Sequence, residues 1–174
     1  MKIFITNLGK YTEGYLIGKW VKLPVSEDKL NEVLEAIGIN EYYEEYFITD
    51  YENEIIGIGD VISEYSSVVA LNELAQRLED LSADEADKLG AVLEYEACRS
   101  VSDVLELLDK LDEFDLLTDV TDDEELGYYY AEEYRCIDIP EHIQPYFDYE
   151  KFGRDVRLQS RCLYTSYGFL LDNR

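Results

Sequence analysis

The residues of this chain best suited to chemistry are its carboxylates, which are densest over residues 103–133. That stretch reads DVLELLDKLDEFDLLTDVTDDEELGYYYAEE and contains a single base, Lys110. Carboxylates can act as general acids and bases, bind cations, or display negative charge to a basic partner. So many are present that no two stand out as a catalytic pair, and the pattern therefore favours charge display.

The negative charge belongs to the body of the chain. Residues 26–150 contain 37 Asp and Glu against 6 Lys and Arg, and the whole chain carries a formal net charge of −25. Both ends are mildly basic: residues 1–25 hold 4 bases and 1 acid, and residues 151–174 hold 5 bases and 2 acids. Such a field repels nucleic acids and anionic membranes and attracts basic proteins or cations. We therefore expect no direct nucleic-acid binding and no membrane partner.

Aromatic content distinguishes the chain from a disordered acidic tail. Its 174 residues are 47% hydrophobic and 13% aromatic, with 16 tyrosines, which predicts a folded protein of one domain or a few small ones in contact. The opening MKIFITNLGK has only a three-residue apolar run, too short for a signal peptide. No run approaches 18 apolar residues, so a cytoplasmic location is expected.

Histidine and cysteine give little support to metal or nucleophilic chemistry. His142 is the single histidine, so no two-histidine metal site can form. Cys98, Cys136 and Cys162 form no CxxC pair, and their odd number argues against a disulfide framework. Cys98 or Cys136 could pair with His142 as a nucleophile, but no surrounding residue indicates activation.

Three short motifs resemble known sites only in part. GYLIGKW (14–20) contains Gly-Lys without the spacing of a phosphate-binding loop, and GIG (57–59) lacks the third glycine of a dinucleotide fingerprint. DVTDDEE (119–125) has the composition of a calcium loop but neither its DxDxDG order nor its central glycine. The sequence predicts no enzyme, no cofactor and no built metal site.

The periodicity predicts an α+β fold with three small subdomains. For a first α+β domain (1–60) it predicts a strand over 2–6, a turn-rich loop, a returning strand over 15–23, a helix over 27–37 capped by Ser26, and a strand over 46–51. A mainly helical domain (61–103) follows. Its helices are expected over 67–81, from the Ser82 capping box to about 97, and from Ser100 or Ser102 through 111.

The third domain (104–174) is expected to be α+β and to contain the acidic region. An extended segment is predicted over 115–120, an amphipathic helix over 122–134, and a small sheet within 161–171, where the alternation of apolar residues is weak. The stretch HIQPYFDYEKFGRDV (142–156) is assigned no element.

A strongly acidic surface has three interpretations: a soluble, highly charged exterior, a docking module for a basic protein, or an imitation of nucleic acid. Duplex DNA carries one charge per about 1.7 Å of axis, so the charge excess of residues 26–150 would match on the order of 50 Å of duplex. An elongated molecule would suit such a match better than a globe.

Four stretches resemble the ArdA antirestriction family. They are MKIFITNLGKYTEGYLIGKWVKLP at the start, FITDYE (47–52), the acidic, tyrosine-rich stretch 116–133 with DVTDDEELGYYYAEE, and YFDYEKFGRDVRL (146–158). They keep their order over almost the full chain. The resemblance implies a non-enzymatic protein of conjugative plasmids or transposons that mimics bent B-form DNA in the bacterial cytoplasm.

The resemblance also implies the partner and the assembly. The partner would be the methyltransferase core of a type I restriction-modification enzyme, whose DNA-binding groove the protein would occupy as an elongated, curved homodimer of three-domain subunits. The alternatives are an acidic adaptor for another basic protein, and an enzyme or cation buffer with a defined calcium or magnesium site.

The residues expected to carry the function fall into two groups. The acidic surface that would imitate phosphates is predicted to contain Asp109, Asp112, Glu113, Asp115, Asp119, Asp122, Asp123, Glu124, Glu125, Glu132 and Glu133. The dimer contacts are predicted to include Phe147, Tyr149 and Phe152.

Overall fold

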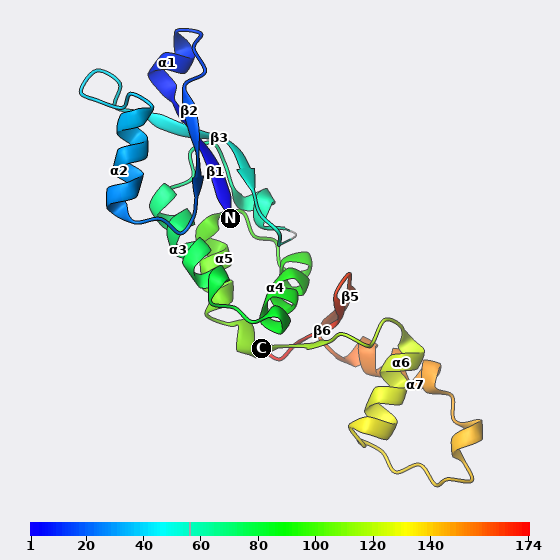
Figure 1. Cartoon of the computed structure of the whole chain (residues 1–174). Helices are drawn as coiled ribbons and strands as arrows, with labels where there is room; N and C mark the ends of the chain where they lie inside the picture. The colour runs from blue at the N-terminus through cyan, green and yellow to red at the C-terminus, as the bar shows by residue number, and fades with distance from the viewer. Residues whose placement is uncertain (56) are drawn as a thin grey trace. The chain divides into compact units, whose positions relative to one another are not determined.

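The computed structural model describes residues 1–55 and 57–174 and shows an α+β protein with two small antiparallel sheets (Figure 1). The chain divides into two compact units. The first comprises Met1–Ala86 and Cys98–Asp109, and the second comprises Asp87–Ala97 and Lys110–Arg174. The α+β class is confirmed, while the division into three subdomains and the elongated shape stay predictions.

The sheet of the first unit has the strand order β2-β1-β3. Strand β1 (Lys2–Asn7) pairs antiparallel with both β2 (Gly18–Lys22) and β3 (Tyr46–Glu52), so the three predicted strands are confirmed and β2 is shorter than expected. Ile3 and Ile5 are fully buried. Alternation along the strand therefore directs one face of β1 into the core.

The loop predicted after β1 contains a short helix, α1 (Leu8–Thr12). Asn7 starts it, because its side-chain oxygen accepts a hydrogen bond from the Lys10 amide at 2.9 Å. Helix α2 (Glu27–Ala36) begins after Ser26 as predicted and buries Val33. A short 3-10 turn, η1 (Ile58–Val61), follows β3.

Helices α3 (Val68–Glu79) and α5 (Val101–Leu108) pack together in the first unit. Ser67 caps α3, and Ser100 forms a reciprocal capping box with Asp103 at the start of α5. Helix α4 (Ala83–Tyr95) begins after the predicted Ser82–Glu85 capping pair and continues from the first unit into the second. The helices predicted between 67 and 111 are confirmed, with ends shifted by a few residues.

The second unit contains a sheet of order β4-β6-β5. After the 3-10 turn η2 (Leu111–Glu113), strand β4 (Phe114–Leu117) pairs antiparallel with β6 (Gly168–Asp172), which also pairs with β5 (Cys162–Thr165). The small sheet expected near the end of the chain is confirmed.

A helical pair completes the second unit (Figure 1). Helix α6 (Asp123–Tyr128) is extended by the wider π-type turn η3 (Tyr129–Glu133), which matches the helix predicted over 122–134. A 3-10 turn, η4 (Gln144–Tyr146), leads to α7 (Tyr149–Gln159), a helix absent from the predictions. Its one buried residue is Gly153, but Tyr149, Phe152 and Val156 are half-buried at helical spacing, a short apolar stripe that the predictions did not use.

No helix within the described residues is long and apolar enough to span a bilayer.

Candidate functional site

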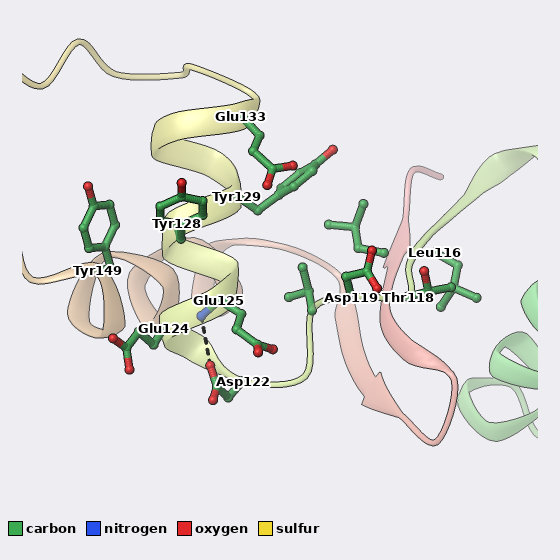
Figure 2. A pocket seen from close by; sticks show the side chains of 12 residues that line it. Leu116, Thr118, Asp119, Asp122, Glu124, Glu125, Tyr128, Tyr129, Glu133 and Tyr149 are labelled. Atoms are coloured by element: carbon green, nitrogen blue, oxygen red, sulfur yellow. Dashed lines mark hydrogen bonds between the residues drawn. The ribbon is translucent and has the colours of Figure 1, made fainter.

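An open pocket of about 620 Å³ in the second unit gathers part of the predicted acidic surface. Five carboxylates line it, together with the rings of Tyr128, Tyr129 and Tyr149 (Figure 2). The carboxylates are those of Asp119, Asp122, Glu124, Glu125 and Glu133. Among the described residues that line it there is no lysine, arginine or histidine. The described lining of the pocket is therefore negatively charged, which suits positively charged side chains.

The start of α6 fixes two of these carboxylates. The Asp122 carboxylate caps the helix by accepting a hydrogen bond from the Glu125 amide at 2.9 Å (Figure 2). Glu125 in turn accepts bonds from the Thr121 amide at 2.7 Å and the Thr121 hydroxyl at 2.8 Å. Acidic groups are also favoured here by the partial positive charge of a helix N-terminus. The carboxylates thus stabilise the helix that displays them.

Helix α6 lies against α7 at two glycines. A Cβ atom placed on Gly127 would lie 1.9 Å from the Tyr149 carbonyl oxygen, and one placed on Gly153 would lie 1.9 Å from the Asp123 carbonyl oxygen. No other residue type can occupy either position at this separation. Close backbone approach of this kind is what small residues permit at helix interfaces.

Asp123 is half-buried between the two helices and the sheet. Its carboxylate accepts bonds from Nε of Arg157 at 2.7 Å and Nη2 of Arg157 at 3.0 Å, and from the Tyr164 hydroxyl at 2.8 Å. The Arg157 guanidinium, and secondarily the Tyr164 hydroxyl, hold the pKa of Asp123 below its ordinary value. Asp123 is therefore a structural carboxylate, with its oxygens turned to protein partners.

Glu132 has a similar role at the other end of the helical segment. It accepts hydrogen bonds from the Tyr149 hydroxyl and from the Gln144 side-chain amide. The bond to Glu132 raises the pKa of Tyr149 to about 12, so the phenol stays protonated as a donor. Asp123 and Glu132 are the two of the eleven predicted acidic residues that are not exposed.

The remaining predicted carboxylates are exposed and lie outside this pocket. Asp109 belongs to the first unit, where Nη2 of Arg77 contacts it at 2.8 Å. Asp115 accepts a bond from the Asn173 side chain at 2.8 Å. Asp112 and Glu113 lie in η2. The structure thus brings five of the eleven residues together in one pocket, and their imitation of phosphates stays a prediction.

The three aromatic residues predicted for the dimer form a cluster within one chain. The ring of Phe147 lies 4.9 Å from that of Tyr149 and 5.5 Å from that of Phe152, centroid to centroid. All three are half-buried. This packing explains how the segment before α7 is held, and the dimer role stays a prediction.

Sequence reasoning missed Gly127, Gly153 and Arg157, which hold α6 in place. The sequence signal for these residues was weak. Each glycine lies inside a helical segment, and because glycine is unfavourable there, its presence suggests close packing. Within the described part of the chain, no group of three or more His, Cys, Asp or Glu residues is arranged to hold a metal ion.

Comparison with known proteins identifies a family. No curated protein matches the sequence. The family described as antirestriction protein (ArdA) matches residues 3–171, which is nearly the whole chain and includes both units. It also covers all four stretches on which the resemblance was noted, apart from the first two residues. The chain therefore belongs to the ArdA family of antirestriction proteins.

Proposed function

We propose that this antirestriction protein presents its carboxylates in place of DNA phosphates and occupies the DNA-binding groove of a type I restriction-modification enzyme. Membership of the family implies an inhibitor that interacts with such enzymes. The DNA mimicry, the homodimeric state and the location in the bacterial cytoplasm are parts of the proposal. In that role it would protect incoming mobile DNA without catalysing a reaction.

The observation that carries the proposal is the pocket beside α6. Five carboxylates line it, from the loop after β4, the start of α6 and η3, with no base among the described lining residues. A DNA-binding groove is lined with lysine and arginine side chains that neutralise phosphates. Carboxylates held on a folded frame offer such side chains a ready counter-charge.

Mimicry of the backbone alone accounts for inhibition regardless of the DNA sequence that the enzyme reads. Phosphate contacts position a protein on DNA but carry no base information. An acidic protein that satisfies the phosphate-binding side chains therefore competes with every DNA sequence. Docking requires no bond to be made or broken.

A competition titration tests the proposal. Purified protein is added to a type I methyltransferase that holds a labelled DNA duplex, at two salt concentrations. We expect displacement that weakens as salt rises, because charge-dominated association falls with ionic strength. Absence of displacement at either salt concentration would reject the proposal for that enzyme and favour the adaptor alternative.

Matched neutralisation tests whether the pocket itself is the contact. The triple variant Asp119→Asn, Glu124→Gln, Glu133→Gln removes three exposed pocket carboxylates. The control, Glu41→Gln, Glu44→Gln, Glu73→Gln, removes the same charge from exposed positions of the first unit. We expect the pocket variant to displace DNA about tenfold less well than the control, because only the pocket carboxylates would lie in the contact with the enzyme. A factor of ten corresponds to about 1.4 kcal/mol. Equal losses would show that net charge acts without a preferred face.

A further inference from the structure

We propose that α7 is the positioning element of the inhibitor, and that Arg157 and Tyr149 fix the α6 carboxylates in the geometry that the enzyme recognises. This inference rests on the proposed function and deepens it. It gives the basic end of the chain a structural role. By charge attraction alone, these bases would weaken binding to a basic groove.

The first support is the backbone contact between the helices. Gly127 and Gly153 are both buried, and each lies against the backbone of the other helix so closely that a Cβ would overlap a carbonyl oxygen. The two helices cannot move closer here, because their backbones are already in contact. Moving them apart would expose both glycines. It sets the position of α6 relative to α7, within the half-buried stripe that Tyr149, Phe152 and Val156 form on α7.

The second support is the bond at the start of α6. Arg157 grips both oxygens of Asp123, the first residue of the helix, and Tyr164 from β5 adds a third bond. The side chains of Arg157 and Asp123 are 34% and 19% exposed, so water only partly screens the pair. A fork with two parallel bonds fixes orientation as well as distance. Glu124 and Glu125 follow directly in the chain.

The third support lies at the far end of the segment. The Tyr149 hydroxyl donates to Glu132 in η3, and the Tyr149 ring lies 5.6 Å from that of Tyr128, centroid to centroid. Glu133, which lines the pocket, is the next residue. The acidic segment is therefore tied to α7 at both ends, and the pocket carboxylates lie next to the tied positions.

Rigid display has a physical consequence for binding. Side chains and loops that are ordered before docking lose less conformational freedom on docking, which strengthens binding without a new contact. A positive charge on α7 that orders the acidic helix can therefore increase affinity for a basic groove, although it lowers the net negative charge.

The test uses this conflict between charge and position. Arg157→Gln and Arg154→Gln each remove one positive charge from α7. Of these two arginines, Arg157 bonds to Asp123, whereas Arg154 is exposed. If net charge alone mattered, both variants would bind the methyltransferase slightly more tightly than the parent. We expect Arg157→Gln to displace DNA about fivefold less well, as the cost of ordering one or two more side chains implies, and Arg154→Gln to equal or exceed the parent.

Tyr149→Phe provides a second variant with no change in charge, and Arg157→Lys provides a rescue. The phenylalanine keeps the ring and removes the bond to Glu132, so we expect weaker displacement and a smaller dependence of affinity on salt, since fewer carboxylates engage together. Lysine can make only one of the two bonds to Asp123 and should restore part of the loss.

Circular dichroism is used to check that each variant is folded. All titrations are done well below the melting temperature of every variant. A purely structural role would leave affinity and salt dependence unchanged under those conditions. Equal behaviour of Arg157→Gln and Arg154→Gln while the parent displaces DNA would overturn the inference alone. Failure of the parent itself to displace DNA would overturn the proposed function. The ordering role would still be supported if the amides of residues 123–133 exchanged faster in folded Arg157→Gln than in folded Arg154→Gln.

Discussion

The sheet of the first unit and the α6–α7 pair of the second are held together in different ways. Around β1, buried apolar side chains form the core, including Ile3, Ile5 and Val21. Between α6 and α7, two glycines lie close against the backbone of the opposite helix, and the side-chain contacts include an ion pair and a tyrosine–carboxylate bond. In the first region the charged side chains lie outside an apolar core. In the second region they take part in the contacts that hold two helices together.

That difference determines what a change in charge can do. Acidic side chains on the surface of an apolar core can be altered with little effect on folding, because the core remains. Where carboxylates bond to the neighbouring helix, neutralising them alters the fold and the recognition surface together. Suitable variants can separate the effect on folding from the effect on recognition. The largest loss of stability is expected at the glycine contact between α6 and α7.

Gly153→Ala should have the largest effect on stability. Alanine favours a helix over glycine by about 1 kcal/mol, but the added Cβ would lie 1.9 Å from the Asp123 carbonyl oxygen. We expect the overlap to prevail with a net loss of about 3 kcal/mol in the free energy of unfolding, measured by urea denaturation. Gly14→Ala is the control: it meets nothing within 4 Å, has a φ of 91°, and should cost about 1 kcal/mol through backbone strain alone. Equal losses would remove the special status of the contact.

Asp123→Asn should have the next largest effect, and one that depends on pH. Arg157 lowers the pKa of Asp123 in the folded state. The carboxylate therefore contributes stability that is fully present above its ordinary pKa of about 3.9 and is lost as pH falls through the lowered folded value. We expect a loss of about 1–2 kcal/mol at pH 7, allowing for partial exposure.

The difference between Asp123→Asn and the parent should shrink in urea titrations as the pH is lowered below 4. Asp112→Asn, at an exposed position in η2, serves as the control and should show little difference at either pH. A pH-independent loss for Asp123→Asn would mean that shape rather than charge holds the helices together.

Asp122→Ala should cost about 1 kcal/mol, because it removes the cap of α6. Asp122→Asn should cost much less, since asparagine is an equally good capping residue. Ser26→Ala, which removes the cap of α2 in the first unit, gives a matched comparison. Thermal unfolding of the three variants would show whether a carboxylate cap differs from a hydroxyl cap, and a full loss in Asp122→Asn would indicate that the negative charge is needed.

Glu124→Gln should have the smallest effect on stability, within about 0.5 kcal/mol, as expected for an exposed side chain without a special role. Glu41→Gln in the first unit should behave alike. Added salt should raise the melting temperature of the parent, since it screens repulsion within a chain of net charge −25. A large loss in Glu124→Gln would erase the distinction between tied and untied carboxylates.

Local patterns in the sequence were sufficient for much of the fold. Apolar residues at helical spacing after Ser26, Ser67 and Ser100 predicted α2, α3 and α5, because a cap and an apolar stripe lie within a few residues of each other. Short runs rich in β-branched and aromatic residues predicted β1 and β3. The helix α1 was missed, since Asn7 caps a segment that lacks any buried residue.

The candidate site divides along the same line. The sequence by itself determined the charge, the acidic stretch and the family, because composition and ordered motifs need no coordinates. Only the tertiary structure decided which carboxylates face a pocket and which are tied to α7. Arg157 meets Asp123 across 34 residues and Tyr149 meets Glu132 across 17. Contacts between residues so far apart in the chain leave no periodic pattern in the sequence. They depend on how α6 and α7 pack together in the folded protein, at Gly127 and Gly153.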